Sequence, residues 1–338
     1  MALRKARAAV ASTVEVEAAA EELLGKGNAV DAVVAGVFAA CATTAGALLG
    51  PVQILVAGAG AGFLAIDGRV RQPGIGAPRP RGFTTTDEIP EAARIGVPWL
   101  PAALSVAVAT MGSATFGQVL GPALALAKGS PRHEVLSRIA ARGPRAVEER
   151  PLGSELLAVA GRPSGGLLTS DDLSSPRPEV QKASRIDIGS GRELITLPWT
   201  RIQDRRPAAP MHDIEIARVR AVMAVDRNAT FAFACWDDPA DGLLLPDVGL
   251  RAPYCAEPVR RGQTRIRPGE VRAAAAPVAF LGADAPDVAL TAFGASDAYD
   301  VLAQAIAEMI ASETFSARGE ARLVALAHAK GTASVLRG

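Results

Sequence analysis

Hydrophobic and polar residues alternate along this chain with two different periods, which predict helices in some segments and strands in others. Residues 14–25 and 28–41 have helical spacing, and Asn28 is typical of a helix N-cap. Further helices are predicted at 100–128, 132–150, 167–173, 297–315 and 319–330. Strands are predicted at 52–58, 62–68, 185–199, 214–226, 229–236 and on either side of 282–287. Helices and strands come in blocks rather than in strict alternation, which predicts an α+β layered fold.

One irregular segment divides the chain. Residues 200–213 read TRIQDRRPAAPMHD and are rich in proline and charge, without a helical or strand period. This composition is typical of a linker. We therefore expect a single domain over residues 1–338, built from a part at 1–199 and a part at 214–338.

A long uncharged stretch raises the question of a membrane span. No charged residue occurs from Ala32 to Ile66, which is long enough to cross a bilayer. Pro51 and a run of glycines divide the stretch into a helix-like half and a strand-like half. A buried helix followed by a buried strand is therefore the favoured interpretation, because a true span is more uniformly apolar.

Composition excludes several classes of partner. The 36 Lys and Arg residues balance 35 Asp and Glu residues, and the net charge of +1 gives no reason to expect nucleic acid or a membrane surface. The basic N-terminus is interrupted by Glu15 and Glu17 before any apolar segment, so we expect no signal peptide and a cytoplasmic protein. With only 4% aromatic residues, the core must consist of Ala, Val and Leu.

Cofactors and metals are not expected either. Three cysteines and three widely spaced histidines form no set with metal-ligand spacing. Gly58, Gly60 and Gly62 follow a predicted strand, but the next segment reads as another strand. A dinucleotide site needs a helix there, so the glycine run predicts no nucleotide cofactor.

The stretch FAFACWDD at 231–238 carries the most distinctive chemistry. Phe231, Phe233, Cys235 and Asp237 have the same parity and point to one face of a strand. Two interpretations are open. Cys235 is either a small hydrophobic residue in the core or a thiol placed over a cleft beside Asp237.

Several segments together resemble the γ-glutamyltransferase family, whose members are N-terminal-nucleophile hydrolases. They are AVASTVEVEAAAEELLGKGNAVDAVVAGVFA, the glycine run with GFLAIDGRV, VPWLPAALSVAVATMGSATFGQVLGPALALAKG, LLTSDDLSS and RPGEVRAAAAPVAFLGADAPDVALTAFGAS. The resemblance implies a four-layer αββα sandwich, in which 1–199 corresponds to the family's large subunit and 214–338 to its small subunit. It also implies self-cleavage that frees an N-terminal threonine, which then attacks a γ-glutamyl amide.

The chain departs from the family's pattern at the decisive positions. The resemblance places Val219 at the nucleophile, and valine has no nucleophilic atom. Gly74 falls at the arginine that holds the substrate carboxylate, and AAAAP at 273–277 covers the paired serines. The two oxyanion-hole glycines fall on Gly294 and Ala295, which we take as substrate-binding positions.

Three other positions gain chemistry. Cys235 and Asp237 fall on the family's threonine and asparagine beside the nucleophile, and Arg251 falls on an aspartate that holds the substrate's amino group. Cys235 would act as nucleophile or acid and Asp237 as base, while Arg251 would bind an anionic group. The competing interpretations are core packing for Cys235, a turn residue for Asp237 and a surface salt bridge for Arg251.

The sequence thus predicts a divergent γ-glutamyltransferase-like protein that is not self-processed. In the favoured hypothesis a repurposed cleft acts on a small amino-acid-derived or carboxylate-bearing metabolite, as in biosynthetic tailoring. The alternative is a catalytically inactive pseudoenzyme that serves as a binding or partner subunit. We expect a small-molecule ligand and allow a homo-oligomer or a partner enzyme.

Overall fold

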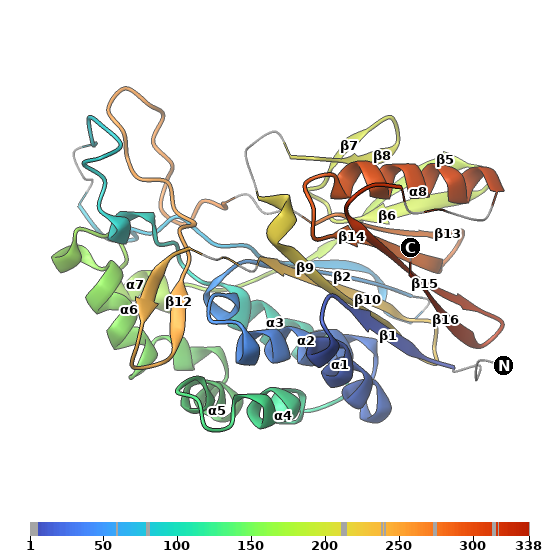
Figure 1. Cartoon of the computed structure of the whole chain (residues 1–338), viewed down its shortest axis with the longest axis horizontal. Helices are drawn as coiled ribbons and strands as arrows, with labels where there is room; N and C mark the ends of the chain where they lie inside the picture. The colour runs from blue at the N-terminus through green and yellow to red at the C-terminus, as the bar shows by residue number, and fades with distance from the viewer. Residues whose placement is uncertain are drawn as a thin grey trace.

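The fold is a sandwich of two antiparallel sheets between two layers of helices (Figure 1). The computed structural model describes residues 6–58, 60–78, 82–210, 215–237, 239, 241–272, 276–312, 316 and 318–337. The predicted α+β class and the four-layer αββα arrangement are both confirmed. Within the described residues, no helix has the length and apolar character needed to cross a bilayer.

Each sheet has six strands. The first sheet has the order β1 (Ala8–Ala11), β9 (Val219–Val225), β10 (Phe231–Asp237), β2 (Val52–Gly58), β3 (Gly62–Gly68) and β4 (Val180–Lys182). The second has the order β16 (Thr332–Arg337), β15 (Arg322–Ala329), β14 (Pro286–Phe293), β13 (Val278–Gly282), β6 (Arg192–Thr196) and β5 (Ser184–Gly189). Two small hairpins lie outside them, β7 (Arg201–Gln203) with β8 (Arg206–Ala208), and β11 (Leu243–Leu245) with β12 (Leu250–Ala252).

Strand parity decides which layer each side chain joins. On β9 and β10, Met223 and Phe233 point into the core between the sheets, whereas Val222 and Ala234 point toward the helices. Both faces are buried, so these strands are apolar except for the partly buried Arg220 of β9 and Asp237 at the end of β10. Phe280 of β13 meets Phe231 of β10 at 5.9 Å between ring centroids, and this pair joins the two sheets.

Helices cover both outer faces. The first sheet is covered by a layer that contains α1 (Val14–Lys26), α2 (Ala29–Thr43), α3 (Leu100–Met111), α4 (Phe116–Ala127), α5 (Arg132–Arg142), α6 (Leu152–Ala160) and α7 (Ser170–Ser174). The second is covered by α8 (Ala298–Ser312). Short 3-10 turns lie at Ala47–Leu49, Glu91–Arg94, Gly143–Val147, Arg162–Ser164 and Ile216–Arg218.

The uncharged stretch forms the centre of this helical layer. α2 is buried along almost its whole length and ends before β2, so the prediction of a buried helix and strand is confirmed. Asn28 caps α2, as predicted. Its side chain accepts from the Asp31 N–H, and the Asp31 carboxylate accepts from the Asn28 N–H in return.

The helix predicted at residues 319–330 was wrong. Residues 319–330 do not form a helix, because most of the segment is strand β15. Its alanines and leucines favour helix locally, but pairing with β14 and β16 on both sides outweighs that preference. The segment predicted as a linker contains the β7–β8 hairpin, where Asp204 and Arg205 both have positive φ, as a two-residue hairpin turn requires. Residues 211–213 of that linker lie outside the described residues.

Candidate active site

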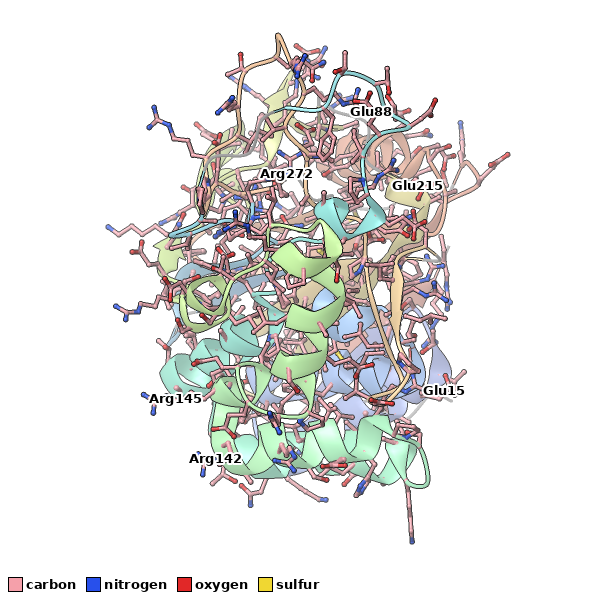
Figure 2. All side chains as sticks on the ribbon, turned by 90° about the vertical axis from the view of Figure 1, so that its left-hand side faces the viewer. Glu15, Glu88, Arg142, Arg145, Glu215 and Arg272 are labelled. Carbon is pink, nitrogen blue, oxygen red and sulfur yellow. The ribbon has the colours of Figure 1, made fainter. Side chains whose placement is uncertain are left out.

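Three of the predicted site residues meet at one end of the first sheet. Val219 begins β9 and stands directly opposite Asp237, the last residue of β10. Cys235 lies two residues deeper, opposite Ala221. Figure 2 views the molecule from the side on which β9 begins, with Glu215 and Arg272 in its upper half. The pairing of Val219 with Asp237 follows from the β9–β10 register.

The position that the sequence resemblance assigns to the nucleophile is buried. The Val219 side chain is buried, with 3% of the residue exposed, and the residues before it form the 3-10 turn Ile216–Arg218. Arg218 donates two hydrogen bonds to the carboxylate of Asp237, from Nε to Oδ1 at 3.2 Å and from Nη2 to Oδ2 at 2.9 Å. This ion pair lies across the strand end, next to Val219.

Arg218 has further acidic neighbours. It also pairs with Asp241 at 3.1 Å and with Glu215. Partial burial alone would lower the pKa of Arg218, but the hydrogen bonds and charge of Asp237, with the other two carboxylates, outweigh it and raise that pKa. The guanidinium is therefore permanently charged, and Asp237 serves as its partner rather than as an unpaired base.

Cys235 belongs to the core between the sheets. It is 1% exposed and packs in the cluster that contains Phe233 and Phe280. Gln53 of β2 places its Nε2 3.7 Å from the Cys235 Sγ. Burial raises the pKa of the Cys235 thiol far above its usual value, although the hydrogen bonds from Gln53 oppose the shift. This geometry favours the packing interpretation over a thiol that reacts at neutral pH.

The three cysteines are expected to differ in their rates of alkylation. Cys255 is partly exposed, and burial by neighbouring groups raises its pKa to about 12, whereas Cys41 and Cys235 are fully buried. At neutral pH Cys255 should react first, and the other two only on unfolding. Mass spectrometry after timed alkylation at several pH values measures this order. Fast reaction of Cys235 with an apparent pKa below that of a free thiol, about 8.5, would restore it as a catalytic candidate.

The structure adds residues that sequence reasoning missed. Gln53 accepts a hydrogen bond from the Trp199 Nε1, so a polar chain runs from Cys235 to the surface of the sandwich. Tyr299 of α8 accepts from the Ala276 N–H at 3.2 Å, and burial raises the pKa of Tyr299 to about 12. Gln53 gave a usable signal, because it is polar within the otherwise apolar run VQILVAG.

A charged cluster follows the end of β3. Asp67 accepts from Arg69 Nε and Nη2, both at 2.9 Å, and from Arg71 Nη2 at 3.1 Å. Burial alone would raise the pKa of Asp67, but hydrogen bonds and charge from the two arginines outweigh it and lower that pKa. Each guanidinium stacks on an indole, Arg69 on Trp199 at 4.5 Å and Arg71 on Trp99 at 4.0 Å. With two cations and one anion, the cluster carries an excess positive charge.

The other predicted positions are not joined to this centre by polar contacts. Arg251 donates from Nη1 to the Gly242 carbonyl at 3.0 Å, and no hydrogen bond or ion pair between described residues links it to Asp237. Gly294 follows β14 with φ +91°, and Ala295 packs on the side of α8. Alanines 273–275 lie outside the described residues. In the part of the chain that the structure describes, His, Cys, Asp and Glu form no group of three that could hold a metal ion.

Solved structures match this chain along its length. A scan against protein-family models and a search of curated proteins gave no match. Cephalosporin acylase from Bacillus halodurans has a TM-score of 0.72 at 13% identity, covering 98% of this chain and 96% of the other. An LmbA2991 structure has a TM-score of 0.74 at 14% identity, covering 98% and 96%. This chain has the fold of an N-terminal-nucleophile hydrolase.

The same fold relates the chain to a γ-glutamyltranspeptidase. The enzyme from Helicobacter pylori has a TM-score of 0.51 at 18% identity, covering 59% of this chain and 72% of the other. The resemblance inferred from the sequence is thereby confirmed at the level of the fold. The sequence resemblance assigns the nucleophile to the first residue of β9, and in this chain that residue is a buried valine.

Proposed function

We propose that this protein remains a single uncut chain and uses its cleft for a small carboxylate-bearing, amino-acid-derived molecule, without covalent γ-glutamyl transfer. The proposal is carried by the start of β9, where the sequence resemblance assigns the nucleophile to Val219, whose side chain is alkyl, and where Arg218 is held to Asp237. An acyl-enzyme needs an oxygen, sulfur or nitrogen nucleophile, which valine does not supply.

The surroundings support an anionic ligand. The cluster of Asp67, Arg69 and Arg71 leaves one positive charge in excess at the end of β3. The similar structures are named as a cephalosporin acylase and a γ-glutamyltranspeptidase, names that point to small-molecule chemistry. By analogy we place the protein in the tailoring of small amino-acid-derived metabolites.

A catalytically inactive binding or partner subunit is the second candidate function. The surroundings of the two predicted catalytic residues favour it. Cys235 is buried and protonated, and Asp237 is held in an ion pair with Arg218. An inactive subunit would keep the layered fold and would bind another protein, or a ligand that it does not convert.

An intact-mass experiment tests the shared part of both proposals. The purified protein should give one species near the sequence mass of 34.7 kDa, before and after incubation with a γ-glutamyl anilide. No acyl adduct and no released aniline are expected, because Val219 cannot be acylated. Two fragments that break before Val219, or steady release of the aniline, would overturn the proposal.

A ligand panel separates the two candidates. Thermal unfolding is measured with γ-glutamyl and N-acyl amino acids, because a ligand that binds only the folded state raises the unfolding temperature. A stabilising compound that is consumed, as followed by chromatography and mass spectrometry, supports the repurposed enzyme. A stabilising compound that stays intact supports the binding subunit.

A further inference from the structure

A cavity of about 220 Å³ lies between two loops that extend from the end of the sandwich. One wall is the chain after β3, at residues 72–78, and the other belongs to the segment at 259–268 between β12 and β13. In Figure 1 these parts of the chain rise together at the upper left. Phe83 fixes the second loop, since its N–H donates to the Val259 carbonyl at 2.8 Å and its carbonyl accepts from the Arg261 N–H at 3.0 Å.

Buried polar groups hold the first wall in position. Asp172 is fully buried and accepts from the backbone N–H groups of Gly74 at 2.8 Å and Ile75 at 3.0 Å. Gln72 is 2% exposed, and its side-chain amide bonds both the carbonyl and the N–H of Glu257, at 2.8 and 3.1 Å. Because these bonds are all made within the protein, they hold the wall in place independently of any ligand, which lowers the cost of binding.

The charged residues that line the cavity are all positive. Arg265 and Arg267 line it, and no Asp or Glu is among its lining residues. Neither arginine forms an ion pair with a residue that the structure describes. The carboxylate of the neighbouring Glu270 accepts a hydrogen bond from the backbone N–H of Arg267, at 2.9 Å. This contrasts with Arg69, Arg71 and Arg218, which are all paired with carboxylates.

The remaining walls are apolar. They come from Leu167, Val259, Ile266 and three prolines. Gly74 also lines the cavity, with φ +115°, and carries no side chain into it. An apolar body and an anionic end of one ligand would therefore both find partners here. Guanidinium groups suit carboxylates because two N–H donors can meet the two oxygens.

We propose that this cavity is a binding site for a small carboxylate whose body is apolar, with Arg265 and Arg267 holding the carboxylate. Pockets for drug-sized ligands measure roughly 300–1,000 Å³, so this one fits a molecule of amino-acid size. The inference rests on the proposed function for the carboxylate class of the ligand. It locates that ligand between the two loops, in a cavity that Val219 does not line.

Calorimetric titration of the full-length protein tests the site with matched probes. N-acetyl-L-leucine carries the carboxylate, and N-acetyl-L-leucinamide is its uncharged counterpart. The wild type should bind the acid at least about tenfold more tightly than the amide, because charged hydrogen bonds to two arginines are lost with the amide. In Arg265→Gln/Arg267→Gln the affinity for the acid should fall at least about tenfold, with the amide unchanged.

Two further variants separate charge from shape. Arg260→Gln removes an exposed cation from the same loop that does not line the cavity, so it should leave both affinities unchanged. Ala77→Phe places a ring in the cavity and should weaken the acid and the amide alike. Unfolding temperatures equal to the wild type confirm that each variant is folded.

The outcomes distinguish this inference from the proposed function. Wild-type affinity for the acid in both Arg265→Gln/Arg267→Gln and Ala77→Phe means that a carboxylate binds elsewhere, which overturns the cavity and leaves the proposed function standing. Equal affinity of the wild type for acid and amide, no saturable binding of the acid, or tighter binding of phenyl phosphate overturns the carboxylate assignment. Self-cleavage or acyl-enzyme formation, seen by mass, overturns the proposed function alone.

Discussion

Replacing Asp172 by alanine is expected to lower the free energy of unfolding by about 3–5 kcal/mol. Asp172 is fully buried, and its carboxylate accepts from the N–H groups of Gly74, Ile75 and Thr169 and from the Thr169 hydroxyl. Alanine leaves the three N–H groups without this acceptor, while the Thr169 hydroxyl keeps the Ile75 carbonyl at 3.0 Å, and each buried donor costs about 1–3 kcal/mol when water cannot replace the partner. The first turn of α7 also loses its capping box.

The neighbouring acid supplies the matched control. Asp171 is exposed in the same turn of α7, so Asp171→Ala removes the same charge and should cost at most about 1 kcal/mol, through the helix dipole alone. Urea unfolding of both variants measures the difference. Equal losses would show that Asp172 acts by charge at the helix N-terminus rather than by satisfying buried N–H groups. Asp172→Ala should also weaken acid binding in the cavity, because Gly74 loses its anchor.

Phe280→Ala is expected to lower the free energy of unfolding by about 3–5 kcal/mol as well. Phe280 is fully buried between the sheets and stands 5.9 Å from the Phe231 ring. The core cluster around it is close-packed and also holds Phe233 and Met223, so its neighbours cannot move far enough to fill the space of a lost ring. The substitution removes apolar contacts and leaves a cavity between the two layers.

An exposed aliphatic residue provides the comparison for Phe280. Leu244 on β11 is 60% exposed, and Leu244→Ala should change stability by no more than about 0.5 kcal/mol. Denaturant midpoints of the two variants are compared at the same protein concentration. A loss below about 1 kcal/mol for Phe280→Ala would mean that the sheets close over the gap, which would contradict a rigid core between them.

The parts of the fold that depend on neighbouring residues were predictable from the sequence. β2 and β3 occupy the predicted residues, and the Asn28 cap begins α2 as expected, because hydrophobic period and capping chemistry act over a few residues. The resemblance also led to the sandwich. β15 was missed because its leucines and alanines suit a helix, and only its neighbours β14 and β16 make it a strand.

The candidate site was predictable in part. Parity placed Cys235 and Asp237 on one face of β10, which the structure confirms, but parity carries no information about depth. Whether Cys235 reaches solvent depends on the second sheet, whose strands lie elsewhere in the sequence. The partner of Asp237 depends on the register with β9, which brings Arg218 beside it. The Arg265 cavity depends on two loops meeting and had no local signal.

The strand order also constrains how the protein is made. β2 is hydrogen-bonded to β10, and the paired residues Gln53 of β2 and Cys235 of β10 are 182 residues apart in sequence. At about 5–20 residues per second, a ribosome needs roughly 10–40 s to deliver the second strand after the first. Throughout that time the uncharged stretch with α2 and β2 lacks its partner strand β10, and β1 waits somewhat longer for β9. The nascent chain therefore exposes this apolar surface until β10 has been made, a period in which chaperones have the most to protect.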